Sequence, residues 1–134
     1  MLSKAEPRLQ RARATVLVVE DEVAVRTILA EQLQDVGLCV VEARNADDAW
    51  RYIQAGNRPD LVFSDVEMPG SMNGMELARR SKARHPHIKF IVMSARPKPA
   101  GCESVGLFIV KPFSLIDAAQ TTLESLKGID PEVA

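Results

Sequence analysis

The chain has 134 residues, which is room for one compact domain and not for a second folded module. Its composition, 46% apolar and 26% charged, is typical of globular proteins rather than of disordered chains. A formal net charge of -1 provides no general field that attracts nucleic acid or an acidic membrane. The longest apolar runs are far shorter than the roughly 20 residues that span a bilayer, and the first 14 residues lack the apolar core of a secretory signal. We therefore expect a cytoplasmic protein without a nucleic-acid or membrane partner.

Five short apolar runs alternate with segments of helical periodicity. The runs predict strands at 15–19, 38–41, 60–64, 88–93 and 106–110. Apolar spacing and capping residues predict helices over 23–36, between Asn45 and Gly56, from Asn73 to about residue 85, and between Ser114 and Gly128. Strands separated by helices are typical of repeated right-handed βαβ units. The sequence therefore predicts an α/β fold with a doubly wound parallel sheet.

One connection and the two ends depart from this rhythm. Residues 96–106 contain two prolines and two glycines, so we expect the fourth helix to be shortened to a turn or two. We interpret 1–13 as a flexible N-terminal extension, 14–128 as the domain and 129–134 as a C-terminal tail.

Polar residues follow four of the five predicted strands. Glu20 and Asp21 follow the first strand, Asp65 the third, Ser94 the fourth and Lys111 the fifth. Taken singly, each could be a helix cap or a solvated side chain. In doubly wound sheets, however, the carboxyl ends of the strands form the binding crevice. We therefore expect these five residues to form one site.

Charge indicates what such a site would bind. Each pair of carboxylates about 5 Å apart repels by about 3 kcal/mol at an effective dielectric of about 20, and one lysine cannot neutralise three. Mg²⁺ suits a small site because it accepts carboxylates while leaving positions for phosphate oxygens. Asp65 is the carboxylate best placed to attack phosphorus and form an acyl phosphate. Asp21 and Glu20 would hold the metal, Lys111 would offset charge on the phosphoryl oxygens, and Ser94 would donate a hydrogen bond to the transferred group.

Four segments in this order resemble the receiver domains of bacterial two-component response regulators, over roughly residues 14–128. They are Val16–Glu22, Val62–Pro69, Met93–Ala95 and Val110–Pro112. The resemblance implies a five-stranded, flavodoxin-like parallel sheet with strand order 2-1-3-4-5.

It also implies the residue roles. Asp65 would be the phosphoacceptor, and the donor would be a phosphohistidine on a sensor histidine kinase or histidine phosphotransfer protein. The metal ligands would be Glu20, Asp21, Asp65 and the backbone carbonyl of Glu67. Ser94 and Lys111 match the family's hydroxyl and lysine, and Phe108 matches its switch aromatic. Because it has no phenolic hydroxyl, Phe108 could report the switch only by packing, and an ordinary core aromatic on the fifth strand is an equal alternative.

Three features depart from the family pattern. The segment from Asp65 to Gly74 is longer than usual, and the segment from Ser94 to Lys111 is shorter than usual. The face that the fourth helix would build is where many relatives dimerise, so we leave open a monomer or a weak dimer. Glu67 could alter the lifetime of the acyl phosphate, with a solvated loop acid as the alternative interpretation.

The residues favour a signalling phosphoacceptor that modifies itself rather than a turnover enzyme. Only 23 residues follow Lys111, too few for a DNA-binding output domain. A Mg²⁺-dependent phosphatase, with Asp65 as nucleophile and Glu67 as acid or base, is a second interpretation. As a family, such phosphatases place the pair after the first strand, whereas here it follows the third. A receiver domain excised from a hybrid kinase and a constitutive binding module with this fold are two further interpretations.

Overall fold

A computed structural model of the protein describes residues 13–127. The expected N-terminal extension, apart from its last residue, and the expected C-terminal tail lie outside the described residues. The strands are β1 (Thr15–Val19), β2 (Cys39–Ala43), β3 (Leu61–Asp65), β4 (Lys89–Ser94) and β5 (Leu107–Val110). The helices are α2 (Val23–Asp35), α3 (Ala46–Gln54), α4 (Gly74–Arg84) and α5 (Leu115–Leu126), with a short 3-10 helix η1 (Cys102–Ser104).

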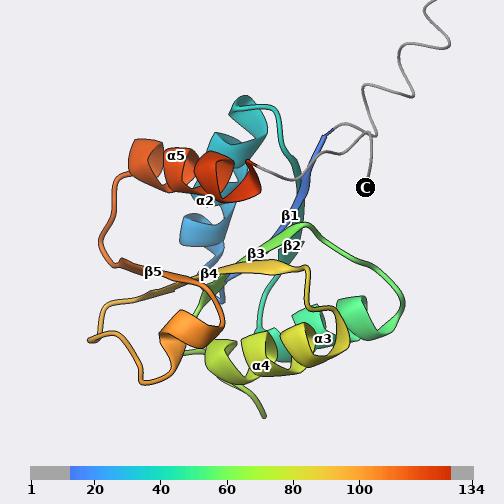
Figure 1. The fold of residues 1–134 in the computed structure, drawn as a ribbon. Helices are drawn as coiled ribbons and strands as arrows, with labels where there is room; N and C mark the ends of the chain where they lie inside the picture. The colour runs from blue at the N-terminus through green and yellow to red at the C-terminus, as the bar shows by residue number, and fades with distance from the viewer. Residues whose placement is uncertain (1–12, 128–134) are drawn as a thin grey trace, which may run out of the picture.

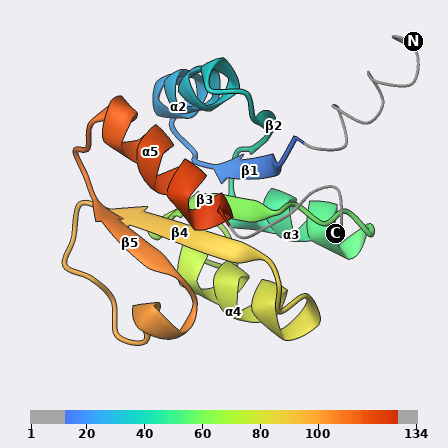
Figure 2. The ribbon, with the colours of Figure 1, turned by 45° about the horizontal axis from the view of Figure 1, so that its top comes forward.

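The strands form one five-stranded sheet in the order β2-β1-β3-β4-β5, and every neighbouring pair is parallel. This confirms the predicted α/β class and the strand order. Helices α2 and α5 cover one face of the sheet, while α3, α4 and η1 cover the other (Figures 1 and 2). Each face carries its own apolar core, one built around Leu17, Val62 and Phe90 and the other around Val18, Phe63 and Ile91. Within residues 13–127, no helix is long and apolar enough to cross a membrane.

Three of the helices begin at the predicted capping residues. The side chains of Asn45, Asn73 and Ser114 each accept a hydrogen bond from the backbone N–H three residues later. Such a cap stabilises a helix by about 1 kcal/mol, because the first N–H groups have no partner within the helix. These caps set where α3, α4 and α5 start, and α4 starts directly beside the end of β3.

The connection between β4 and β5 confirms the predicted shortening of the fourth helix. Between these strands the chain forms only the three residues of η1. β5 is also an edge strand of the sheet, and its Leu107 and Val110 are 50% and 55% exposed.

The second strand differs from the prediction, which ended it at Val41. The structure extends β2 to Ala43, and exposed Glu42 pairs across the sheet with Val18. A charged residue is tolerated there because β2 is an edge strand with one side open to water.

Candidate functional site

Three carboxylates meet at the carboxyl ends of the central strands. Glu20 follows β1 directly and Asp65 is the last residue of β3, its neighbour in the sheet. One carboxylate oxygen from each of Glu20, Asp21 and Asp65 can be chosen so that all three lie within 4.8 Å of one another. Glu20 is fully buried and Asp65 is 6% exposed, whereas Asp21 is open to solvent. The structure thus brings together the three predicted acids, with one side of the cluster reachable from water.

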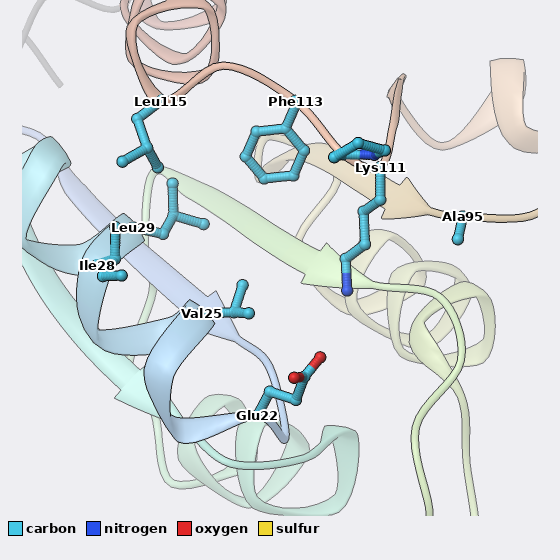
Figure 3. A pocket seen from close by; sticks show the side chains of 9 residues that line it. Glu22, Val25, Ile28, Leu29, Ala95, Lys111, Phe113 and Leu115 are labelled. Atoms are coloured by element: carbon cyan, nitrogen blue, oxygen red, sulfur yellow. The ribbon is translucent and has the colours of Figure 1, made fainter.

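Lys111 enters this cluster from the strand at the sheet edge. Its Nζ donates hydrogen bonds to Glu20 Oε1 at 3.0 Å and to Asp65 Oδ2 at 2.9 Å. The backbone N–H of Lys111 also donates to the carbonyl oxygen of Ser94 at 2.8 Å, which continues the pairing of β5 with β4 beyond the strand end. In Figure 3 the lysine side chain extends to the end of β3. A single ammonium therefore lies between the two buried acids.

Burial sets the electrostatics of these groups. It raises the pKa of Asp65 and of Glu20 above their ordinary values, although the hydrogen bonds from Lys111 act in the opposite direction. Burial alone would lower the pKa of Lys111, but its bonds to the two carboxylates outweigh burial and raise that pKa. Lys111 therefore stays charged at neutral pH, yet one positive charge faces three acids. Carboxylate oxygens are the ligands that Mg²⁺ prefers, so the cluster could bind a metal ion.

Ser94 and Glu67 make a contact that the sequence did not reveal. The fully buried Ser94, at the end of β4, donates its hydroxyl hydrogen to Glu67 Oε1 at 2.7 Å. The hydroxyl oxygen accepts the backbone N–H of Arg96 at 2.9 Å. Glu67 is exposed, as expected of a loop acid, but its carboxylate is bound to protein as well as facing water. Nothing in the sequence signals a contact between residues 27 positions apart.

Arg26 is a second residue that the sequence did not single out. From the first turns of α2, its Nη1 donates to the carbonyl oxygen of Glu20 at 2.7 Å, and its Nε pairs with Glu42 Oε1 at 3.2 Å. The guanidinium thus ties the β1–α2 connection to the edge strand β2. A helical arginine a few residues after an acidic pair looks the same in a sequence whether it is solvated or bound.

Two apolar features lie beside the charged cluster. The predicted switch residue Phe108 is half-buried on β5 and packs against the core on the α3 and α4 face. On the other face, a groove of about 440 Å³ separates Val25 and Leu29 of α2 from Phe113 and Leu115 (Figure 3). Lys111 also lines this groove, so an apolar surface adjoins the charged site.

Comparison with known proteins identifies the family. A family model for the response regulator receiver domain matches residues 16–121. The chain belongs to this family. Receiver domains receive phosphate from histidine kinases in two-component signalling, which agrees with the predicted function.

Relatives of this receiver domain include much longer proteins. It is 40% identical over 123 residues to sensor kinase CckA of Brucella abortus, an alignment that covers 87% of this chain and 13% of the kinase. It is 33% identical over 126 residues to the DNA-binding transcriptional regulator NtrC of Azospirillum brasilense, covering 90% of this chain and 26% of that protein. The chain therefore spans only a small part of either relative.

A solved relative has the same fold. The crystal structure of response regulator protein TrrA from Thermotoga maritima, in complex with Mg²⁺-BeF, is 30% identical to this receiver domain. The two superpose with a TM-score of 0.74, over 84% of this chain and 98% of that one.

Proposed function

We propose that this receiver domain accepts a phosphoryl group on Asp65 in a Mg²⁺-dependent reaction, and that the modified domain then binds a partner differently or passes the phosphoryl group on. The observation that carries the proposal is the position of Lys111. Its ammonium contacts Glu20 and Asp65 at once, while Asp21 stays open to water beside them. This arrangement fits a phosphoryl group, whose negative oxygens need both a cation and a positively charged side chain.

In the proposed site, the metal would be held by Glu20, Asp21, Asp65 and the backbone carbonyl of Glu67. Bound Mg²⁺ would supply positive charge close to the phosphoryl oxygens. The Mg²⁺-BeF complex of TrrA supports this choice of metal. The donor set itself favours a hard cation, because all the proposed ligands are oxygens.

The side chains of this domain then divide the work of transfer. A carboxylate oxygen of Asp65 attacks phosphorus, the new P–O bond forms, and the P–N bond to the imidazole of the donor phosphohistidine breaks. Lys111, whose raised pKa keeps it protonated, offers its charge to the phosphoryl oxygens. Ser94 donates its hydroxyl hydrogen to the bound phosphoryl group, and Phe108 responds through packing.

The proposal extends to setting and partners. A sensor histidine kinase or histidine phosphotransfer protein would be the donor, and the domain at 14–128 would act in the cytoplasm as a monomer or weak dimer. The family match at 16–121 supports these bounds, and the net charge of -1 gives no reason to expect nucleic acid or a membrane as partner. Because both CckA and NtrC are much longer, a receiver that belongs to a larger protein stays an open interpretation.

The test is incubation of the protein with Mg²⁺ and acetyl phosphate, followed by intact mass spectrometry. We expect one base-labile phosphoryl adduct per chain in the wild-type protein and none in Asp65→Asn. Exposed Asp35, at the end of α2, provides the matched control, because Asp35→Asn removes the same charge and should leave the adduct. An adduct that survived in Asp65→Asn would contradict the assignment, and repeated turnover of p-nitrophenyl phosphate would favour a phosphatase.

A further inference from the structure

The hydroxyl that the proposed function assigns to the phosphoryl group is already bound elsewhere. Ser94 Oγ lies 2.7 Å from Glu67 Oε1, and a serine hydroxyl has only one hydrogen to donate. The carboxylate is an ionised acceptor, which makes this bond stronger than one between neutral groups. A phosphoryl group on Asp65 could therefore receive the hydrogen only if Glu67 released it.

We propose that Glu67 is a positioning residue that holds the Ser94 hydroxyl away from Asp65 until a phosphoryl group displaces its carboxylate. The inference rests on the proposed function and adds to it a competitor for the switch hydroxyl. Binding then exchanges one charge-assisted hydrogen bond for another. The net gain that Ser94 contributes to phosphoryl binding is consequently smaller than it would be with a free hydroxyl.

Burial makes the exchange possible. Ser94 is fully buried, so its hydroxyl needs a hydrogen-bond partner, either a protein group or an ordered water. Glu67 is exposed, so its carboxylate can return to water when the hydroxyl leaves. The two partners therefore separate without leaving a buried charge unpaired, which would be far more costly.

A second hydrogen bond links this exchange to the following loop. The backbone N–H of Arg96 donates to Ser94 Oγ at 2.9 Å, so the hydroxyl is held at both its hydrogen and its oxygen. Turning it toward Asp65 disturbs both bonds. Arg96 opens the segment that contains η1, so release of its N–H carries the change into the connection where this chain has almost no helix.

The test uses beryllofluoride with Mg²⁺ as a stable mimic of the phosphoryl group, with affinity measured by isothermal titration calorimetry. Glu67→Ala should tighten binding by about three- to tenfold, because the mimic no longer competes with the carboxylate for the hydroxyl hydrogen and the Ser94–Glu67 bond is partly open to water. Glu67→Gln keeps a neutral acceptor, so its affinity for beryllofluoride should lie between that of the wild-type protein and that of Glu67→Ala. As a control, Glu22→Ala removes another exposed acid, which lines the groove beside Lys111 and whose side chain does not cap α2. This variant should bind beryllofluoride within about twofold of the wild-type affinity.

A double-mutant cycle separates competition for the hydroxyl from simple loss of negative charge. In a Ser94→Ala background, Glu67→Ala should no longer tighten binding, because no hydroxyl remains to compete for. In the wild-type protein, the amide resonance of Arg96 should also shift when beryllofluoride binds. A gain of equal size in the Ser94→Ala background, or no gain from Glu67→Ala at all, would overturn this inference alone. Failure of the wild-type protein to bind beryllofluoride would instead overturn the proposed function, and this inference with it.

Discussion

Gly74 allows the first turn of α4 to pack directly on the backbone of the proposed phosphoacceptor. A Cβ at this position would overlap the carbonyl oxygen of Asp65. The N–H of Gly74 donates to the carbonyl oxygen of Val66 at 2.9 Å, which fixes the helix against the end of β3. The position of Asp65 therefore depends on the absence of a side chain nine residues later in the chain.

We predict that Gly74→Ala displaces this backbone and weakens both the fold and the site. The free energy of unfolding should fall by about 1–3 kcal/mol, the usual cost of forcing extra atoms into a packed region. Gly106→Ala is the matched control, because its Cβ would overlap the carbonyl oxygen of Phe90, away from the site. Urea unfolding should show losses in both variants, whereas calorimetry should show weaker Mg²⁺ binding only in Gly74→Ala. Equal Mg²⁺ affinities in the two folded variants would contradict the role of Gly74.

The residues that directly follow the strands could be predicted to lie in one site, but the contacts of each side chain could not. Glu20, Asp65 and Lys111 could be identified because parallel strands deliver their carboxyl ends to one edge of the sheet. The bond between Ser94 and Glu67 depends on the path of a loop and on two side-chain rotamers. Neither is encoded in periodicity or in local spacing, so this contact forms only through the tertiary structure.

The loop between β3 and α4 is attached to the start of α3. Asp47, in the first turn of α3, accepts hydrogen bonds from the N–H of Ser71 at 3.0 Å and from its hydroxyl at 2.6 Å. Gly70 has a φ of +116°, and a Cβ there would crowd the Asp47 carboxylate. These contacts hold the segment between Asp65 and Gly74, which is longer than usual in the family, against α3.

The Asp47 attachment predicts a pH-dependent contribution to stability. The hydrogen bonds from Ser71 lower the pKa of Asp47 below its ordinary value. A carboxylate whose pKa is lowered in the folded state stabilises the fold above its unfolded pKa, and this contribution disappears as the pH falls through the folded pKa. Asp47→Asn should therefore be less stable than the wild-type protein at pH 7, and the difference should shrink below about pH 4.

Urea unfolding of both proteins over this pH range provides the measurement. Asp35→Asn, which also removes one exposed aspartate, should follow the wild-type protein to within about 0.5 kcal/mol. A difference between Asp47→Asn and the wild-type protein that kept its full size at pH 3 would show that the charge of Asp47 is not responsible.

Local elements were more predictable than their long-range attachments. The caps at Asn45, Asn73 and Ser114 follow from one residue and its own helix, and all three are present. The predicted end of β2 was wrong because pairing with β1, rather than the length of the apolar run, decides where that strand stops. The attachment of Asp47 to Ser71 joins residues 24 positions apart and leaves no local pattern.

The order of the strands in the sheet depends on pairing between distant segments of the chain. The runs that form β1 and β2 look alike in the sequence, yet β1 is almost wholly buried and β2 is half-buried at the edge. Periodicity could therefore predict the strands and the doubly wound class, while the order came from the family resemblance. The same pairing puts β1 beside β3 and thereby places Glu20 next to Asp65.

Because folding assembles the proposed metal site from distant parts of the chain, Mg²⁺ should stabilise the whole domain. A ligand that binds only the folded state adds about 1.4 kcal/mol at tenfold its dissociation constant and about 2.7 kcal/mol at a hundredfold. For a domain of this size, each kcal/mol raises Tm by about 3–6 °C. The acids repel one another without the metal, so part of this gain is relief of strain between charges already packed together.

Thermal unfolding with increasing Mg²⁺ tests this expectation. KCl at matched ionic strength should reproduce only the effect of screening, which is small for buried groups. Asp21→Asn should reduce the rise in Tm, because it removes the one acid of the cluster that is open to solvent, whereas Asp35→Asn should preserve it. An equal rise in Asp21→Asn would place the stabilising metal away from this cluster, since a site that includes Asp21 must lose affinity when its charge is removed.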